Sequence, residues 1–124
     1  MVTVANIATQ ILNENNYTTT DITVANLEYL IENAIDYVNM EANKTIADLS
    51  GAAGSKSIVG TEPEIFTVKC ATILMLRAYL DRGPNATLSG MSVSTVIADP
   101  QYAFWSETLQ VALNRLRGRS ILRT

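Results

Sequence analysis

Residues 50–60 combine the residue types of a phosphate-binding loop, because SGAAGSKSIVG contains glycines, a lysine and serines. A P-loop has the pattern G-x-x-x-x-G-K-[ST], follows a strand and opens a helix, so that its backbone N–H groups surround the phosphates. Here Ser55 separates Gly54 from Lys56, and the preceding residues have a helical pattern. The sequence therefore favours a mobile connecting loop, characterised by Gly51, Gly54 and Lys56, over a nucleotide site.

Other residue types that commonly carry catalysis or bind metals are scarce. The chain has no histidine and a single cysteine, Cys70. These counts exclude an intramolecular disulfide, a Cys/His zinc cluster and every histidine-based dyad or triad. Because Cys70 lies in the most apolar stretch of the chain, we expect an inert core residue. We expect no enzymatic activity and no cofactor.

Glu28, Glu32 and Asp36 follow one another at four-residue spacing and therefore share one face of a predicted helix. No basic residue lies among them, and like charges at this spacing destabilise an isolated helix by ~0.2–0.5 kcal/mol per pair. Three interpretations are open: a solvated face, an acidic surface that meets a partner or lines a lumen for DNA, and a catalytic carboxylate pair. Nothing else in the sequence supports the third.

Tyr29, Asn33, Tyr37 and Met40 line another face of the same helix, away from its main apolar stripe. Tyrosine and methionine are enriched at protein interfaces. This face therefore predicts a contact between subunits, and a wider intramolecular core is the alternative.

Charge is distributed unevenly along the 124 residues. Residues 1–114 contain all 12 acidic residues and five of the nine basic ones, a net charge of −7, whereas residues 115–124 contain four arginines and no acid, a net charge of +4. Arginines can contact phosphates or the carboxylates of an acidic protein surface, and near a helix end they also complement the helix dipole. An apolar pair within this tail indicates a segment that orders on docking. The predicted docking residues are Arg115, Arg117, Arg119, Ile121, Leu122 and Arg123.

Four helices are predicted to position these residues, over 3–13, 23–49, 61–80 and from Pro100 to Gly118, each with apolar residues at helical spacing. Thr61 and Glu64 have the spacing of a capping box. Residues 65–80 are apolar around nearly the whole helix, which predicts the central core helix. Residues 86–98 predict a short β-hairpin or an extended segment. The expected fold is mainly α, a four-helix bundle-like domain over 1–118 with a C-terminal tail at 119–124.

No membrane association is expected. The beginning of the chain lacks the basic segment and long apolar run of a signal peptide. The most apolar stretch contains Lys69 and Arg77 and is shorter than the ~20 residues of a membrane span.

Three segments together resemble the small head–tail connector proteins of tailed bacteriophages, also called head-completion or adaptor proteins. TDITVANLEYLIENAIDYVNMEANKTI resembles their first long helix, PEIFTVKCATILMLRAYLDRG their second core helix, and YAFWSETLQVALNRLRG their closing helix. The resemblance covers about residues 3–118, and it depends on the order and spacing of the three segments. The chain departs from these proteins in its polar loop at 13–21 and in the glycine-containing loop at 50–60.

The resemblance implies a structural virion protein at the head–tail interface, present in the host cytoplasm during assembly. Such proteins form a ring, commonly of twelve copies, under the portal, extend the DNA channel and offer a docking surface to the tail. The implied partners are further copies of the chain, the portal protein, a tail-completion or next connector protein, and genomic DNA passing without sequence recognition. The family also implies a C-terminal segment that docks on the portal.

The alternative is a small helical regulatory or adaptor protein that binds protein or DNA through its arginine-rich tail. The basic residues are concentrated in the last ten positions of an otherwise acidic chain. This distribution argues against a DNA-binding domain, which usually presents a broad basic footprint.

Overall fold

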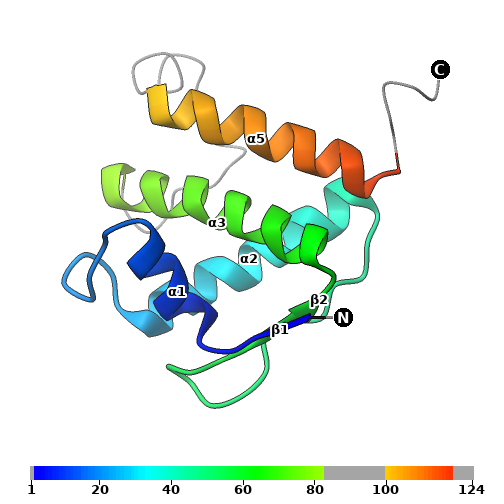
Figure 1. The fold of residues 1–124 in the computed structure, drawn as a ribbon. Helices are drawn as coiled ribbons and strands as arrows, with labels where there is room; N and C mark the ends of the chain where they lie inside the picture. The colour runs from blue at the N-terminus through cyan, green and yellow to red at the C-terminus, as the bar shows by residue number, and fades with distance from the viewer. Residues whose placement is uncertain (1, 83–99, 119–124) are drawn as a thin grey trace.

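The computed structural model describes residues 2–82 and 100–118, and this part of the chain is mainly helical, as predicted. It contains β1 (Val2–Val4), α1 (Ile7–Glu14), α2 (Val24–Ala42), β2 (Ile58–Gly60), α3 (Glu62–Arg82) and α5 (Pro100–Leu116) (Figure 1). The two strands form an antiparallel sheet. The predicted hairpin or extended segment near 86–98 and the tail at 119–124 lie outside the described residues.

Helix α3 occupies the middle of the fold, between α2 and α5 (Figure 1). Its side chains are buried around most of its circumference, including Val68, Ala71, Leu74 and Leu76. This confirms the prediction that residues 65–80 form the central core helix. None of the helices described here has the length and apolarity that a membrane crossing requires.

Local side-chain bonds explain where two of the helices begin. The Thr23 side chain accepts a hydrogen bond from the Asn26 N–H and so caps α2. Thr61 and Glu64 form the predicted capping box: the Thr61 N–H donates to Glu64 Oε1 at 2.9 Å, and the Glu64 N–H donates to Thr61 Oγ1 at 3.3 Å. The capping box begins α3 one residue after the end of the sheet.

Two predicted helices have different bounds in the structure. The helix predicted over 23–49 ends at Ala42, because Asn43 adopts the left-handed conformation, with φ of 54°. The Asn39 side chain then bonds both the N–H and the carbonyl of Ile46, which holds the non-helical segment beside α2. The buried Ile46 and Leu49 continue the apolar pattern of the sequence without continuing the helix.

The helix predicted over 3–13 is replaced at its beginning by a strand. Val2, Thr3 and Val4 pair with residues 58–60 of β2, and the left-handed Asn6 separates this strand from α1. β-branched residues favour an extended backbone, which agrees with a strand here.

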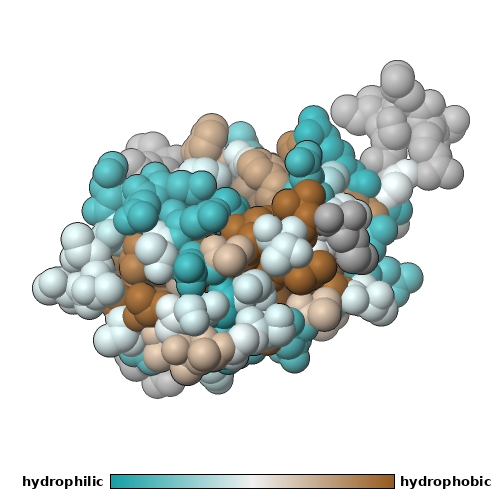
Figure 2. Space-filling model, turned by 60° about the horizontal axis from the view of Figure 1, so that its bottom comes forward, coloured by the Kyte–Doolittle hydropathy of each residue, from teal (hydrophilic) through white to brown (hydrophobic). Residues whose placement is uncertain are grey.

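On the face of the molecule that carries the sheet and the glycine-containing loop, apolar side chains lie among more polar ones (Figure 2).

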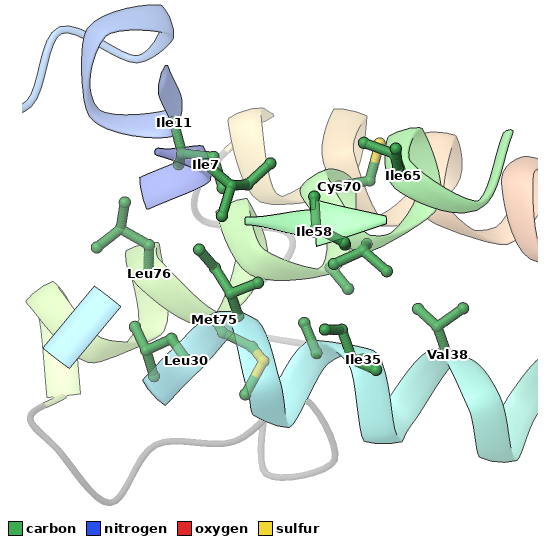
Figure 3. Close-up of a cluster of buried hydrophobic side chains, with 14 of the residues drawn as sticks. Ile7, Ile11, Leu30, Ile35, Val38, Ile58, Ile65, Cys70, Met75 and Leu76 are labelled. Carbon is green, nitrogen blue, oxygen red and sulfur yellow. The ribbon is translucent and has the colours of Figure 1, made fainter. Parts of the chain in front are cut away.

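One cluster of buried apolar side chains joins the helices to the sheet (Figure 3). Ile58 of β2 lies among side chains from three helices and is fully buried. The short sheet is therefore anchored in the same core as the helices. The labelled members are Ile7, Ile11, Leu30, Ile35, Val38, Ile58, Ile65, Cys70, Met75 and Leu76.

Candidate interaction surfaces

The glycine-containing loop is held in place by Glu28 of α2. Residues 50–57 form a hairpin closed by the bridge between Ser50 and Ser57, with N···O distances of 3.0 and 2.8 Å. The Glu28 side chain, only 3% exposed, accepts the Gly54 N–H through Oε1 and the Lys56 N–H through Oε2, both at 2.9 Å. The N–H groups that resemble a phosphate cradle are therefore bound to a carboxylate of the chain itself.

The loop glycines are explained by its shape. Gly51 and Gly54 have φ values of 113° and 92°, and residues that carry a Cβ atom rarely adopt this backbone conformation. Lys56 places its Nζ 3.7 Å from Glu32 Oε2, and both side chains are partly exposed. A surface pair of this kind contributes at most ~1 kcal/mol. The mobility predicted for this loop stays a prediction, but its backbone at Gly54 and Lys56 is fixed to α2.

The three acidic residues of α2 have three different environments. The prediction of an acidic surface is wrong for Glu28, because this side chain is buried under the loop. Glu32 is half-buried and pairs with Lys56. Asp36 is exposed and, within the described residues, has no ion pair. Of the three acidic residues, Asp36 is therefore fully available at the surface and Glu32 only in part.

The four residues predicted as a subunit contact divide into two pairs. Tyr29 and Met40 are 65% and 73% exposed. Asn33 and Tyr37 are half-buried, and Tyr37 packs against the core. Burial, and secondly the nearby Glu41 carboxylate, raise the pKa of the Tyr37 hydroxyl. The alternative of a wider core thus describes Tyr37, whereas Tyr29 and Met40 form an exposed surface.

Arg117 binds within the chain, contrary to its predicted role as a docking residue. Its Nε donates to the Glu41 carbonyl oxygen at 2.6 Å, and a second guanidinium nitrogen lies 3.1 Å from Glu41 Oε2. Its third nitrogen donates to Asn114 Oδ1 at 3.0 Å. Arg117 therefore joins the end of α5 to the end of α2. Arg115 is exposed, and Arg119, Ile121, Leu122 and Arg123 fall outside the described residues.

A second apolar surface, which was not predicted from the sequence, lies along α3 and α5. Phe66, Phe104 and Val111 are each at least half exposed and line a groove of about 310 Å³, together with Glu107 and Arg115. Positions 104, 108, 111 and 115 follow helical spacing opposite the buried stripe that includes Leu109 and Leu113. The helical spacing of Phe104 and Val111 could have been read from the sequence. It was not used, because the apolar stripe that includes Leu109 and Leu113 is the longer one on this helix.

The single cysteine is expected to be unreactive in the folded protein. Burial raises the pKa of the Cys70 thiol to about 11, and the thiolate is the reactive form. We expect alkylation at neutral pH to be roughly 100-fold slower in the native protein than in denaturant, where the pKa returns to its ordinary range. Rates of modification by iodoacetamide, followed by mass spectrometry in both states, check this. Equal rates in both states would contradict the packing of α3.

In the part of the chain that the structure describes, no group of three or more acidic, cysteine or histidine side chains is arranged to hold a metal ion. Comparisons with protein-family models, with curated proteins and with solved structures find no match.

Proposed function

We propose that this protein is a structural subunit that assembles with copies of itself, as a head–tail connector of a tailed bacteriophage. The observation that carries the proposal is the presence of two different exposed apolar surfaces: Tyr29 with Met40 on α2, and the groove between α3 and α5. A closed ring requires each subunit to present two unlike surfaces that fit each other. The resemblance of the helical segments to connector proteins supports the same role.

In this role the subunits form a ring under the portal, extend the DNA channel and receive the tail at the head–tail interface of the virion. The helices would complete a bundle-like domain, and the protein would act without catalysis or a cofactor. Because Arg117 binds Glu41, docking on the portal falls to the residues beyond 118, and the exposed Arg115 stays available for a neighbouring copy. The exposed Asp36 would belong to an acidic surface that meets a partner or the DNA channel.

The decisive experiment is sedimentation of the purified chain with the portal ring encoded in the same genome. We expect co-sedimentation that is lost when residues 119–124 are removed, since this truncation leaves every described helix intact. The matched control is substitution of Asp48, an exposed residue remote from the tail in sequence, by Asn. Failure to bind the portal, together with salt-dependent binding to duplex DNA, would favour the regulatory alternative.

Substitution of Tyr29 by Ala is expected to weaken self-association and leave folding almost unchanged. The side chain is mostly exposed, so its loss should alter the free energy of unfolding by at most ~0.5 kcal/mol. Tyr37→Ala is the matched comparison and should also lower stability, because Tyr37 packs against the core. Sedimentation velocity and thermal melts measure the two effects. A loss of stability as large for Tyr29→Ala as for Tyr37→Ala would argue against a contact surface.

A further inference from the structure

The two exposed surfaces have complementary series of residues. Along α2 and just beyond it, Asp36, Met40 and Lys44 follow at four-residue spacing, in the order anion, apolar, cation. Along the groove, Arg115, Val111 and Glu107 have the same spacing towards the N-terminus of α5, in the order cation, apolar, anion. Four residues of helix cover about 6 Å. Laid antiparallel, the two series place each charge opposite its counterion.

The members of both series are available for such a contact. Asp36, Met40, Glu107, Val111 and Arg115 are exposed. Lys44 is half-buried and follows the left-handed Asn43, so its position departs from the helix, but its long side chain can cover the difference. Across the described ranges, none of the four charged side chains has an ion pair. Pairing them in an interface therefore breaks no existing bond.

One copy of the chain cannot bring its own two surfaces together. The buried residues of α2, including Ile31, Ala34 and Val38, belong to the core that α2 shares with α3, so Tyr29 and Met40 point away from α3. The groove lies between α3 and α5, where α3 packs against α5 and not against α2. Contact between the two surfaces therefore requires two copies, and because the surfaces differ, the arrangement is head-to-tail.

We infer that Met40 of one copy enters the groove between α3 and α5 of the next copy, over Val111, with Asp36 opposite Arg115 and Lys44 opposite Glu107. The flexible thioether of methionine fills irregular apolar spaces and makes favourable contacts with aromatic rings, which Phe66 and Phe104 supply at the groove. The charge pairs fix the register and direction of the two helices. This inference rests on the proposed function, because it names the surfaces through which the copies assemble.

Charge reversal tests the contact directly. Asp36→Arg and Arg115→Asp each place like charges across it, so each variant alone should associate at least roughly tenfold more weakly than the unmodified chain. The double variant should recover association, and so should an equimolar mixture of the two single variants, in which unlike copies alternate. Asp48→Arg is the control, since it makes the same change in charge at an exposed position outside both series. Sedimentation velocity over a concentration series, up to millimolar protein, measures each case.

Recovery in the mixture supports the contact, because a folding defect of either variant cannot be repaired by the other. The inference is overturned if the unmodified chain stays monomeric at millimolar concentration, if the single variants associate normally, or if neither the double variant nor the mixture recovers. Binding to the portal ring is measured separately. Normal portal binding with no effect of charge reversal on self-association would reject this contact and retain the connector role. Recovered self-association without any portal binding would support the contact and reject the connector role.

Discussion

Replacing Glu28 by Ala is expected to lower the free energy of unfolding by about 3 kcal/mol, since hydrogen bonds to a charged group contribute ~1.5–3 kcal/mol each. The change removes the carboxylate that accepts the N–H groups of Gly54 and Lys56 at 2.9 Å. It also leaves a space beneath the loop where the buried side chain lay. Urea denaturation of the variant and the unmodified protein measures the difference.

Glu32→Ala is the matched control, one helical turn away on α2. Its carboxylate is partly exposed and pairs with Lys56 at 3.7 Å, so we expect a loss below ~1 kcal/mol. Glu28→Gln provides a second comparison, because the amide retains one acceptor oxygen but turns an NH₂ group towards the other backbone donor. Amide hydrogen exchange at Gly54 and Lys56 should accelerate in both Glu28 variants and not in Glu32→Ala. Equal destabilisation by Glu28→Ala and Glu32→Ala would show that the loop is not held by Glu28.

The role of Glu28 was not predictable from its spacing. Glu28, Glu32 and Asp36 form a regular series in the sequence, and only the packing of residues 50–57 against α2 distinguishes the first from the others. The hydrogen bonds of Glu28 reach Gly54, which lies 26 positions later in the chain, and Lys56, which lies 28 positions later. Short-range patterns contain no information on such contacts.

The features that the sequence predicted well are local. The capping box of Thr61 and Glu64 has both partners within four residues, and the apolar periodicity of α3 follows from its burial between two helices. The sheet was missed because three-residue strands show no alternating pattern, and Val2 pairs with a residue as distant as Gly60. The end of α2 was missed because Asn39 and Asn43 stop the helix while the apolar pattern continues.

The same distinction applies to the candidate surfaces. The exposed position of Tyr29 and Met40 agrees with a face that lies away from the apolar stripe of α2. Arg117 was placed with the tail because arginines cluster there, and only its approach to Glu41, 76 positions earlier, shows that it belongs to the fold. The groove requires Phe66 and α5 to be adjacent, which depends on the packing of α3 against α5. Long-range packing therefore decides which of the conspicuous residues remain exposed.

Ile58→Ala is expected to cost about 3 kcal/mol, because truncation of a buried isoleucine typically costs ~2–5 kcal/mol. Ile58 is fully buried at the point where β2 meets the helices (Figure 3). Its side chain anchors the sheet in the core, and the hairpin loop held by Glu28 immediately precedes β2. The substitution should therefore loosen the loop as well as the core, with faster amide exchange at Gly54 and Lys56.

Val59→Ala is the control on the opposite face of the same strand. Val59 is 38% exposed and pairs with Thr3, so its truncation removes little buried surface and should cost less than ~1 kcal/mol. Denaturation curves of the two variants, recorded under the same conditions, give the comparison. Similar losses for both would contradict the burial of Ile58, and unchanged exchange at the loop in Ile58→Ala would show that Glu28 holds the hairpin without help from the sheet. The second result would separate the anchoring of the loop from the packing of the core.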